Sequence, residues 1–129
     1  MSKKSILITG CSSGIGYDAA YTLAQRGWQV FATCRQQADC DRLAGEGLES
    51  FRLDYEDAES IRAAVAALLS RTGGTLDALF NNGAYAIPAP LEDVPRDAMR
   101  AIFEANLIGY HDLTNQIIPA MRAQATAGS

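Results

Sequence analysis

Cysteine and histidine are scarce in this chain, and their scarcity excludes two common frameworks of small domains. The cysteines Cys11, Cys34 and Cys40 are an odd number, no two of them form a CxxC pair, and there is one histidine. Disulfide frameworks need paired cysteines, and structural zinc sites need four Cys or His ligands. Neither is expected, and because the aspartates show no metal-ligand spacing, no metal is predicted.

Positive charge is also in short supply. The chain has 11 Lys and Arg residues against 15 Asp and Glu residues, a formal net charge of -4. This balance offers no attractive field to a nucleic-acid backbone or to an anionic bilayer. Nucleic acid and membrane surfaces are therefore not expected as partners.

Long hydrophobic runs are missing as well. The apolar stretch 6–8, which follows Lys3 and Lys4, ends at Thr9 and Gly10. A signal-peptide core or a membrane span needs a much longer apolar run. The sequence therefore predicts a cytoplasmic protein.

What remains is the composition of a globular domain. The 129 residues are 48% hydrophobic and 20% charged, which excludes disorder of the whole chain. This length provides for one hydrophobic core and leaves no room for two. We therefore treat residues 1–129 as one domain.

Hydrophobic periodicity predicts strands that alternate with helices. Short apolar or β-branched runs predict strands at residues 5–9, 29–34, 49–53 and 76–80, the last of them covered on both faces. Helical spacing follows each strand: up to Gly27, over 38–44, from Asp57 to Gly73, and over 96–122. Strands joined by helical crossovers predict a Rossmann-like, doubly wound parallel α/β sheet.

The last predicted helix, 96–122, has apolar residues on more than one face. We expect it to be buried on two sides, with a kink near Pro119. His111 on this helix has no visible acid or nucleophile partner, so a solvated surface position is expected for it.

The turn after the first predicted strand, TGCSSGIG at residues 9–16, is the most informative segment. Glycines allow a tight turn and a close approach of the backbone to a ligand, and the following helix N-terminus favours a phosphate. The alternative is a plain strand-to-helix turn. Because the pattern follows a strand and opens a helix, it predicts binding of a dinucleotide diphosphate. The predicted binding residues of this turn are Gly10, Ser12, Ser13, Gly14, Ile15 and Gly16, with Cys11 as a small filler.

The end of the second predicted strand bears on the choice of coenzyme. An acidic residue there would accept hydrogen bonds from a ribose 2′-OH, whereas a cation would accommodate a 2′-phosphate. The stretch is ATCRQ, with Arg35 and no carboxylate before Asp39. A planar guanidinium suits phosphate, so NADP is predicted over NAD. The alternative is a solvated surface arginine.

Four motifs in order resemble the N-terminal part of the classical short-chain dehydrogenase/reductase family. The turn at 9–16 has that family's T-G-x-x-x-G-x-G spacing, and LDYED, NNGA and EANLIG follow at the expected places. The resemblance implies that Asp54 meets the adenine amino group, with Tyr55 beside it. It also implies that Asn82, Gly83 and Ala84 line the adenosine ribose. Gly83 and Ala84 are exchanged relative to the family's N-N-A-G.

The resemblance gives Asn106 of EANLIG a catalytic role, because the family's asparagine organises a water-linked proton relay to an active-site lysine. The alternative is an asparagine whose polar groups are satisfied within a packed helix. In the family, a tyrosine followed four positions later by lysine transfers the proton. No tyrosine here has that partner, since the only lysines are Lys3 and Lys4.

By this resemblance the chain is the coenzyme-binding half of a family domain, truncated after its fourth strand and helix. The implied function is an NADP-dependent oxidoreductase of an alcohol/carbonyl pair, similar to the hydroxysteroid and retinol dehydrogenase branch. The alternatives are a module that binds NADP(H) without turnover, and a flavodoxin-like or nucleotide-sugar protein. An unpaired fourth strand and a helix lacking its neighbour predict a homo-oligomer.

Overall fold

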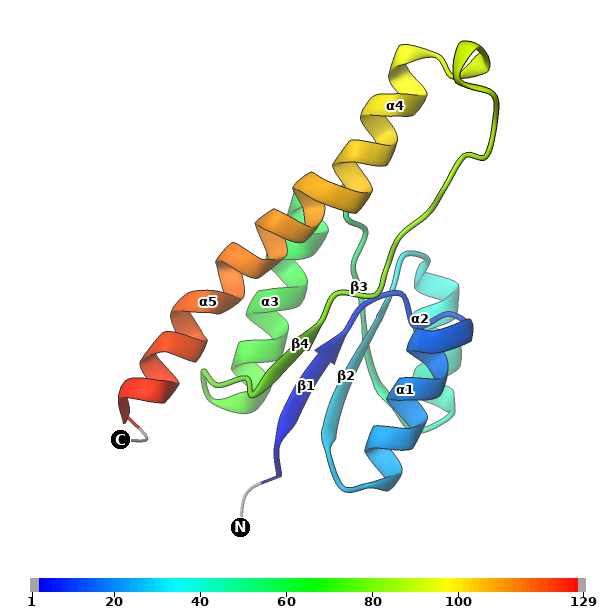
Figure 1. The fold of residues 1–129 in the computed structure, drawn as a ribbon. Helices are drawn as coiled ribbons and strands as arrows, with labels where there is room; N and C mark the ends of the chain where they lie inside the picture. The colour runs from blue at the N-terminus through cyan, green and yellow to red at the C-terminus, as the bar shows by residue number, and fades with distance from the viewer. Residues whose placement is uncertain (1–2, 128–129) are drawn as a thin grey trace.

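Four short parallel strands form one sheet in the computed structural model, which describes residues 3–127 (Figure 1). The strands lie side by side in the order β3-β2-β1-β4. Their bounds are β1 Ser5–Ile8, β2 Gln29–Cys34, β3 Glu49–Arg52 and β4 Ala78–Phe80. The predicted Rossmann-like parallel fold is confirmed.

The helices cover both faces of the sheet (Figure 1). Two of them, α1 and α2, lie on one face, and α3 and α5 lie on the other. The helical segments are α1 Gly14–Gln25, α2 Gln37–Gly45, α3 Ala58–Thr72, a short 3-10 turn Leu91–Asp93, α4 Arg96–Phe103, a π-helical turn Glu104–Ile108 and α5 Gly109–Ala127. Among residues 3–127, no helix combines the length and apolarity needed to cross a bilayer.

The strand order places a crevice beside β1. The chain runs outward from β1 to β2 and β3, and then returns to add β4 on the other side of β1. In such open sheets the two connections leave β1 and β4 in opposite directions, and ligands bind at the carboxyl ends of the strands at that point. The topology alone therefore locates the candidate site.

Alternation along the strands builds a separate core on each face. Ile6 and Ile8 of β1 are buried toward α1 and α2, whereas Leu7 between them is buried toward α3 and α5. Neighbouring side chains of a strand point to opposite faces, so each short strand serves both cores. Phe31 of β2, opposite Leu7, is fully buried in the second core.

Helix α3 has a capping residue at each end, Asp57 before it and Gly73 after it. The side chain of Asp57 accepts hydrogen bonds from the backbone N–H groups of Glu59 and Ser60 in the first turn, as an N-cap residue does. Gly73 follows the helix with φ of 75°, the left-handed conformation that suits glycine. The predicted helix from Asp57 to Gly73 is thus confirmed, with both named residues acting as caps.

The prediction that the last helix is buried on two sides is wrong. Leu113 and Ile117 are buried against α3, but Phe103, Leu107 and Ile108 remain 49%, 57% and 49% exposed. The apolar periodicity of a helix shows which of its faces could be buried, but not which element would cover them. Among the described residues, no element covers this second face.

The kink expected near Pro119 stays a prediction. The change in helical geometry is the π-helical turn Glu104–Ile108, and α5 continues through Pro119 to Ala127. Proline removes one N–H donor from the helix, and helical structure nevertheless continues past Pro119. The fourth strand is also shorter than the predicted 76–80. Its end is open, since Phe80 is 37% exposed at the sheet edge rather than covered on both faces.

Gly109 lets the start of α5 approach Tyr55, in the segment after β3. A Cβ at this position would lie 2.6 Å from the backbone oxygen of Tyr55 and closer still to the Tyr55 Cβ. Those atoms belong to a buried segment, so the neighbour has no free direction in which to move. Glycine is therefore a packing requirement at the start of α5.

We expect Gly109→Ala to destabilise the protein by about 1–3 kcal/mol, the usual cost of forcing an extra carbon into a packed contact. Urea unfolding measures this directly. The matched control is Gly45→Ala, because a Cβ at the end of α2 meets no atom within 4 Å. A Gly109→Ala protein as stable as the Gly45→Ala protein would show that the contact does not constrain the helix.

Candidate functional site

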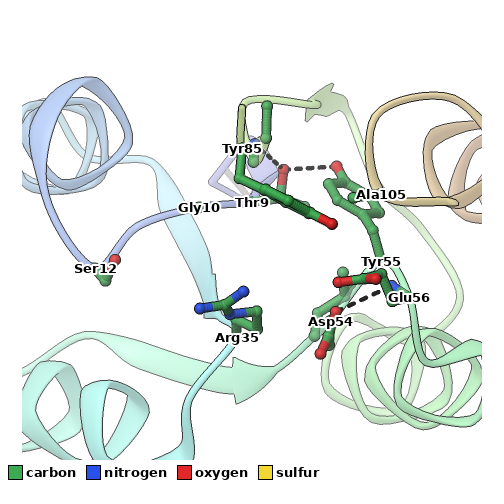
Figure 2. A pocket seen from close by; sticks show the side chains of 12 residues that line it. Thr9, Gly10, Ser12, Arg35, Asp54, Tyr55, Glu56, Tyr85 and Ala105 are labelled. Carbon is green, nitrogen blue, oxygen red and sulfur yellow. Dashed lines mark hydrogen bonds between the residues drawn. The ribbon is translucent and has the colours of Figure 1, made fainter. Parts of the chain in front are cut away.

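A cavity of about 210 Å³ opens at the carboxyl ends of the strands (Figure 2). It lies at the crevice that the strand order predicts, and the turns after β1, β2, β3 and β4 all contribute to it. Its lining residues are Thr9, Gly10, Ser12, Arg35, Leu53, Asp54, Tyr55, Glu56, Gly83, Ala84, Tyr85 and Ala105. Seven of the predicted binding residues are thus brought together: Gly10, Ser12, Arg35, Asp54, Tyr55, Gly83 and Ala84.

The glycine turn and the segment after β4 meet backbone to backbone. Gly10 has φ of 69°, and a Cβ on it would lie 2.6 Å from the Cα of Gly83. No side chain fits between the two segments, and the positive φ independently favours glycine. Relative to the family's N-N-A-G, the exchange at 83–84 places glycine, the smallest residue, at position 83, where the segment contacts Gly10.

Thr9 joins three segments of the site through one hydroxyl. Its Oγ1 accepts hydrogen bonds from the backbone N–H groups of Asn82 at 3.0 Å and Gly83 at 2.9 Å. It also lies 2.7 Å from the Tyr55 hydroxyl, the contact drawn as a dashed line in Figure 2. The Asn82 side-chain amide donates to the carbonyls of Thr9 and Gly10, both at 3.2 Å. Asn82 thus supports the turn from behind instead of lining the cavity.

The start of α1 leaves amide donors unused by the protein. Ser13 is the N-cap residue with φ of -163°, and its side chain makes no capping hydrogen bond. Gly14, Ile15 and Gly16 form the first turn, where N–H groups lack helical acceptors. These residues do not line the cavity wall itself, and Ile15 is 72% exposed. The free N–H groups and the helix dipole suit an anion.

A cation and a carboxylate, Arg35 and Asp54, both line the cavity (Figure 2). Arg35, at the end of β2, is exposed, and no carboxylate among residues 3–127 forms an ion pair with its guanidinium. Asp54 lies 3.8 Å from Arg52 and also accepts a hydrogen bond from the Glu56 backbone at 3.0 Å. The cation is therefore unpaired, whereas the carboxylate already has partners.

Tyr55 contributes its ring to the site and keeps its hydroxyl inside the protein. The hydroxyl donates to Asn81 Oδ1 at 2.6 Å, and the residue is 8% exposed. Burial raises the pKa of this phenol above its ordinary value, so it stays protonated at neutral pH. Its chemistry is structural, although the residue does line the cavity as predicted.

Asn106 holds the segment after β4 by two hydrogen bonds. Its Oδ1 accepts from the Tyr85 backbone N–H at 3.2 Å, and its Nδ2 donates to the Tyr85 carbonyl at 2.8 Å. Asn106 lies in the π-helical turn and does not line the cavity, although its neighbour Ala105 does. The structure thus shows a satisfied asparagine, and the catalytic role stays a prediction.

Five lining residues were not predicted: Thr9, Leu53, Glu56, Tyr85 and Ala105. Four of them lie within the quoted motifs TGCSSGIG, LDYED and EANLIG, and Tyr85 directly follows NNGA, so their place in or beside these motifs is the signal that could have indicated them. Tyr85 extends into the cavity from beyond the NNGA segment (Figure 2). Burial, and next the nearby Glu56 carboxylate, raise the pKa of the Tyr85 phenol.

Comparison with known proteins identifies the family. Residues 4–129 match the family described as short chain dehydrogenase, and the chain belongs to this family of oxidoreductases. The resemblance noted in the sequence is therefore confirmed.

Three curated relatives illustrate the family's range. The chain is 38% identical over 119 residues to the uncharacterized oxidoreductase YbbO of Escherichia coli (strain K12), covering 92% of this chain and 44% of YbbO. It is 36% identical over 108 residues to an NADPH-dependent 1-acyldihydroxyacetone phosphate reductase of Schizosaccharomyces pombe, covering 83% and 36%. It is 34% identical over 129 residues to human retinol dehydrogenase 8, covering 92% and 40%. The chain thus spans less than half the length of these relatives.

Solved structures share the fold. A short-chain dehydrogenase from Streptomyces avermitilis aligns with a TM-score of 0.87 at 32% identity, over 95% of this chain and 46% of that one. A 3-ketoacyl-(acyl-carrier-protein) reductase from Brucella melitensis, complexed with NADH, aligns with a TM-score of 0.88 at 31% identity, over 97% and 52%.

Two buried thiols near the glycine turn make the stability of the folded state depend on pH. Burial raises the pKa of Cys11 and of Cys34 from 9.0 to about 12. A group whose pKa is raised by folding stabilises the folded state fully below its unfolded pKa, and this stabilisation is lost as pH rises through the folded value. We expect the free energy of unfolding, measured in urea, to fall between pH 9 and pH 12.

The variants Cys11→Ala and Cys34→Ala serve as controls for this pH profile. Each should have a shallower decline than the unmodified chain, whatever its stability at pH 7, because one titrating thiol is gone. Identical slopes in all three proteins would assign the decline to other groups.

Proposed function

We propose that this chain is the coenzyme-binding half of an NADP-dependent oxidoreductase that interconverts an alcohol and a carbonyl compound. The observation that carries the proposal is the Arg35 guanidinium at the end of β2, which forms no ion pair with any of residues 3–127 and lies in one cavity with Gly10 and Ser12 of the glycine turn. A cation that forms no ion pair within the described part of the chain suits a 2′-phosphate at this place.

The residues present fit this coenzyme. The Gly10 and Gly83 backbones form a cradle that a Cβ would fill, and the first turn of α1 offers amide donors that no side chain caps. In the proposal, the turn at 9–16 holds the diphosphate, Arg35 with Ser12 holds the 2′-phosphate, and Asp54 meets the adenine. Asn82, Gly83 and Ala84 shape the ribose site.

The bound coenzyme would supply or accept a hydride. Asn106 would keep the wall of the site in place through its two hydrogen bonds with the Tyr85 backbone. Oδ1 and Nδ2 each make one bond there, so each keeps a second lone pair or N–H with which it could take part in a proton relay. Both NADPH and NADH occur among the similar proteins: one relative is named as NADPH-dependent, and one solved structure is complexed with NADH. The preference for NADP in this proposal therefore rests on Arg35.

Charge reversal at Arg35 tests the proposal. We expect the chain to bind NADPH more tightly than NADH in calorimetry, and Arg35→Asp to weaken NADPH by about 10- to 100-fold, the worth of a charge-assisted hydrogen bond. NADH lacks the 2′-phosphate, so its Kd should change less than threefold.

Arg96→Asp is the matched control. It makes the same change of charge at an exposed residue in the first turn of α4, where an acid is well tolerated. Both coenzymes should bind this variant as they bind the unmodified chain. Equal losses of NADPH and NADH in Arg35→Asp would remove the basis for phosphate recognition.

We also propose that the partner of the exposed apolar helix face is a second copy of this chain. Phe103, Leu107 and Ile108 are each about half exposed on one continuous helical rod. The outer edge of β4 has no strand beside it among the described residues. Apolar patches and open strand edges both favour association.

Sedimentation equilibrium at micromolar concentration should therefore give a mass larger than one chain. Leu107→Glu should weaken the association at least tenfold, because it would place a charge in the apolar contact. His111→Glu, at an exposed position of α5, is the control for added charge. A monodisperse monomer at high concentration would contradict self-association.

A further inference from the structure

Arg42 reaches the glycine turn from a neighbouring helix. It lies in α2, outside the cavity lining, and its Nη2 donates a hydrogen bond to the Ser12 carbonyl at 2.7 Å. Ser12 itself lines the cavity. The guanidinium therefore contacts the site from behind, through the backbone of the turn.

Partners from two helices hold the guanidinium in place. Its Nη2 lies 3.5 Å from Asp39 Oδ1, its Nη1 lies 3.6 Å from Glu46 Oε1, and its Cζ lies 5.6 Å from the centre of the Tyr17 ring. These side chains are partly exposed, so each ion pair contributes little to stability. Together they restrict where the planar guanidinium can point.

Glu46 is in turn fixed by α1. The Tyr17 hydroxyl donates to Glu46 Oε2 at 2.9 Å, and the Tyr21 hydroxyl donates to the same oxygen. These hydrogen bonds hold the pKa of Glu46 below its usual value, so the carboxylate facing Arg42 is charged at neutral pH. The arrangement therefore joins α1, α2 and the glycine turn into one network.

The bond to Ser12 sets the direction of the next amide. In a planar trans peptide the C=O and N–H groups point in opposite directions. With the Ser12 carbonyl turned toward Arg42, the Ser13 N–H must point away from α2. Ser13 is the N-cap of α1, so its N–H precedes the uncapped donors of the first turn. A rotated peptide would present an oxygen there and repel an anion.

We propose that Arg42 is a positioning residue that fixes the Ser12–Ser13 peptide for diphosphate binding. This role rests on the proposed coenzyme site and differs from that of Arg35. Arg35 lines the cavity and would contact the 2′-phosphate, which only NADPH has. Arg42 would orient the peptide beside the diphosphate, which NADPH and NADH share. Loss of Arg42 therefore affects NADPH and NADH alike.

The test compares Arg42→Met, which keeps the apolar stem and removes the donors, with Arg42→Lys and with Arg62→Met. Arg62 pairs with Glu59 on α3 and lies outside the cavity, so Arg62→Met controls for the loss of a surface arginine. Calorimetry gives Kd for NADPH and NADH with each protein. Backbone amide resonances of Ser13 and Gly14 in the ligand-free proteins report the orientation of the peptide.

We expect Arg42→Met to raise both Kd values by the same factor, about tenfold, and to shift the Ser13 and Gly14 amide resonances. Arg42→Lys should recover part of the affinity for both coenzymes, and Arg62→Met should change neither. A purely structural role would lower the urea midpoint without these paired effects. Arg42→Lys provides the same comparison if Arg42→Met does not fold.

Three results would overturn the role of Arg42. The first is a loss of NADPH affinity alone, which would make Arg42 a direct phosphate contact. The second is unchanged affinity for both coenzymes in a folded variant, and the third is unchanged Ser13 and Gly14 resonances. If the unmodified chain binds neither coenzyme, the proposed function fails, and the ligand-free resonances still decide whether Arg42 fixes the peptide.

Discussion

The contact between the turn after β1 and the segment after β4 is the constraint on which the site depends. The Gly83 backbone lies so close to Gly10 that a side chain at position 10 would not fit. The Thr9 hydroxyl contacts both the Gly83 N–H and the Tyr55 hydroxyl. The hydrogen bond between the Gly83 N–H and the Thr9 hydroxyl joins residues 74 positions apart in sequence. Because β1 and β4 are neighbours in the sheet, this contact gives the crevice between their ends a fixed shape.

Two arginines near this crevice differ in what surrounds them. Arg35 has no acidic partner among residues 3–127, so its charge is available to a ligand, whereas Arg42 is held by Asp39, Glu46 and the Ser12 carbonyl. An arginine whose donors are engaged orients its neighbours, and one whose donors are free attracts an anion. In our proposals, Arg42 therefore positions the turn and Arg35 recognises the 2′-phosphate, in a chain that belongs to the short chain dehydrogenase family.

The sequence predicts those features that depend on local chemistry. The strand and helix pattern, the glycine turn and the charge of Arg35 can be read from neighbouring residues, and the structure places Gly10, Ser12 and Arg35 in one cavity. Contacts between distant segments could not be predicted in this way. The sequence therefore did not indicate that Thr9 joins the segments after β1, β3 and β4, or that Tyr85 lines the cavity. The exposed face of the last helix was mistaken for a buried one because periodicity does not identify the partner.

A titration of NADPH into the isotopically labelled chain, followed by backbone amide resonances, tests the central claim most directly. If the glycine turn holds the coenzyme, saturable shifts will concentrate at residues 10–16, with further shifts at Arg35 and Asp54, while amides at the far ends of the strands stay unchanged. Shifts confined to another surface, or no saturable shift in folded protein, would contradict the account.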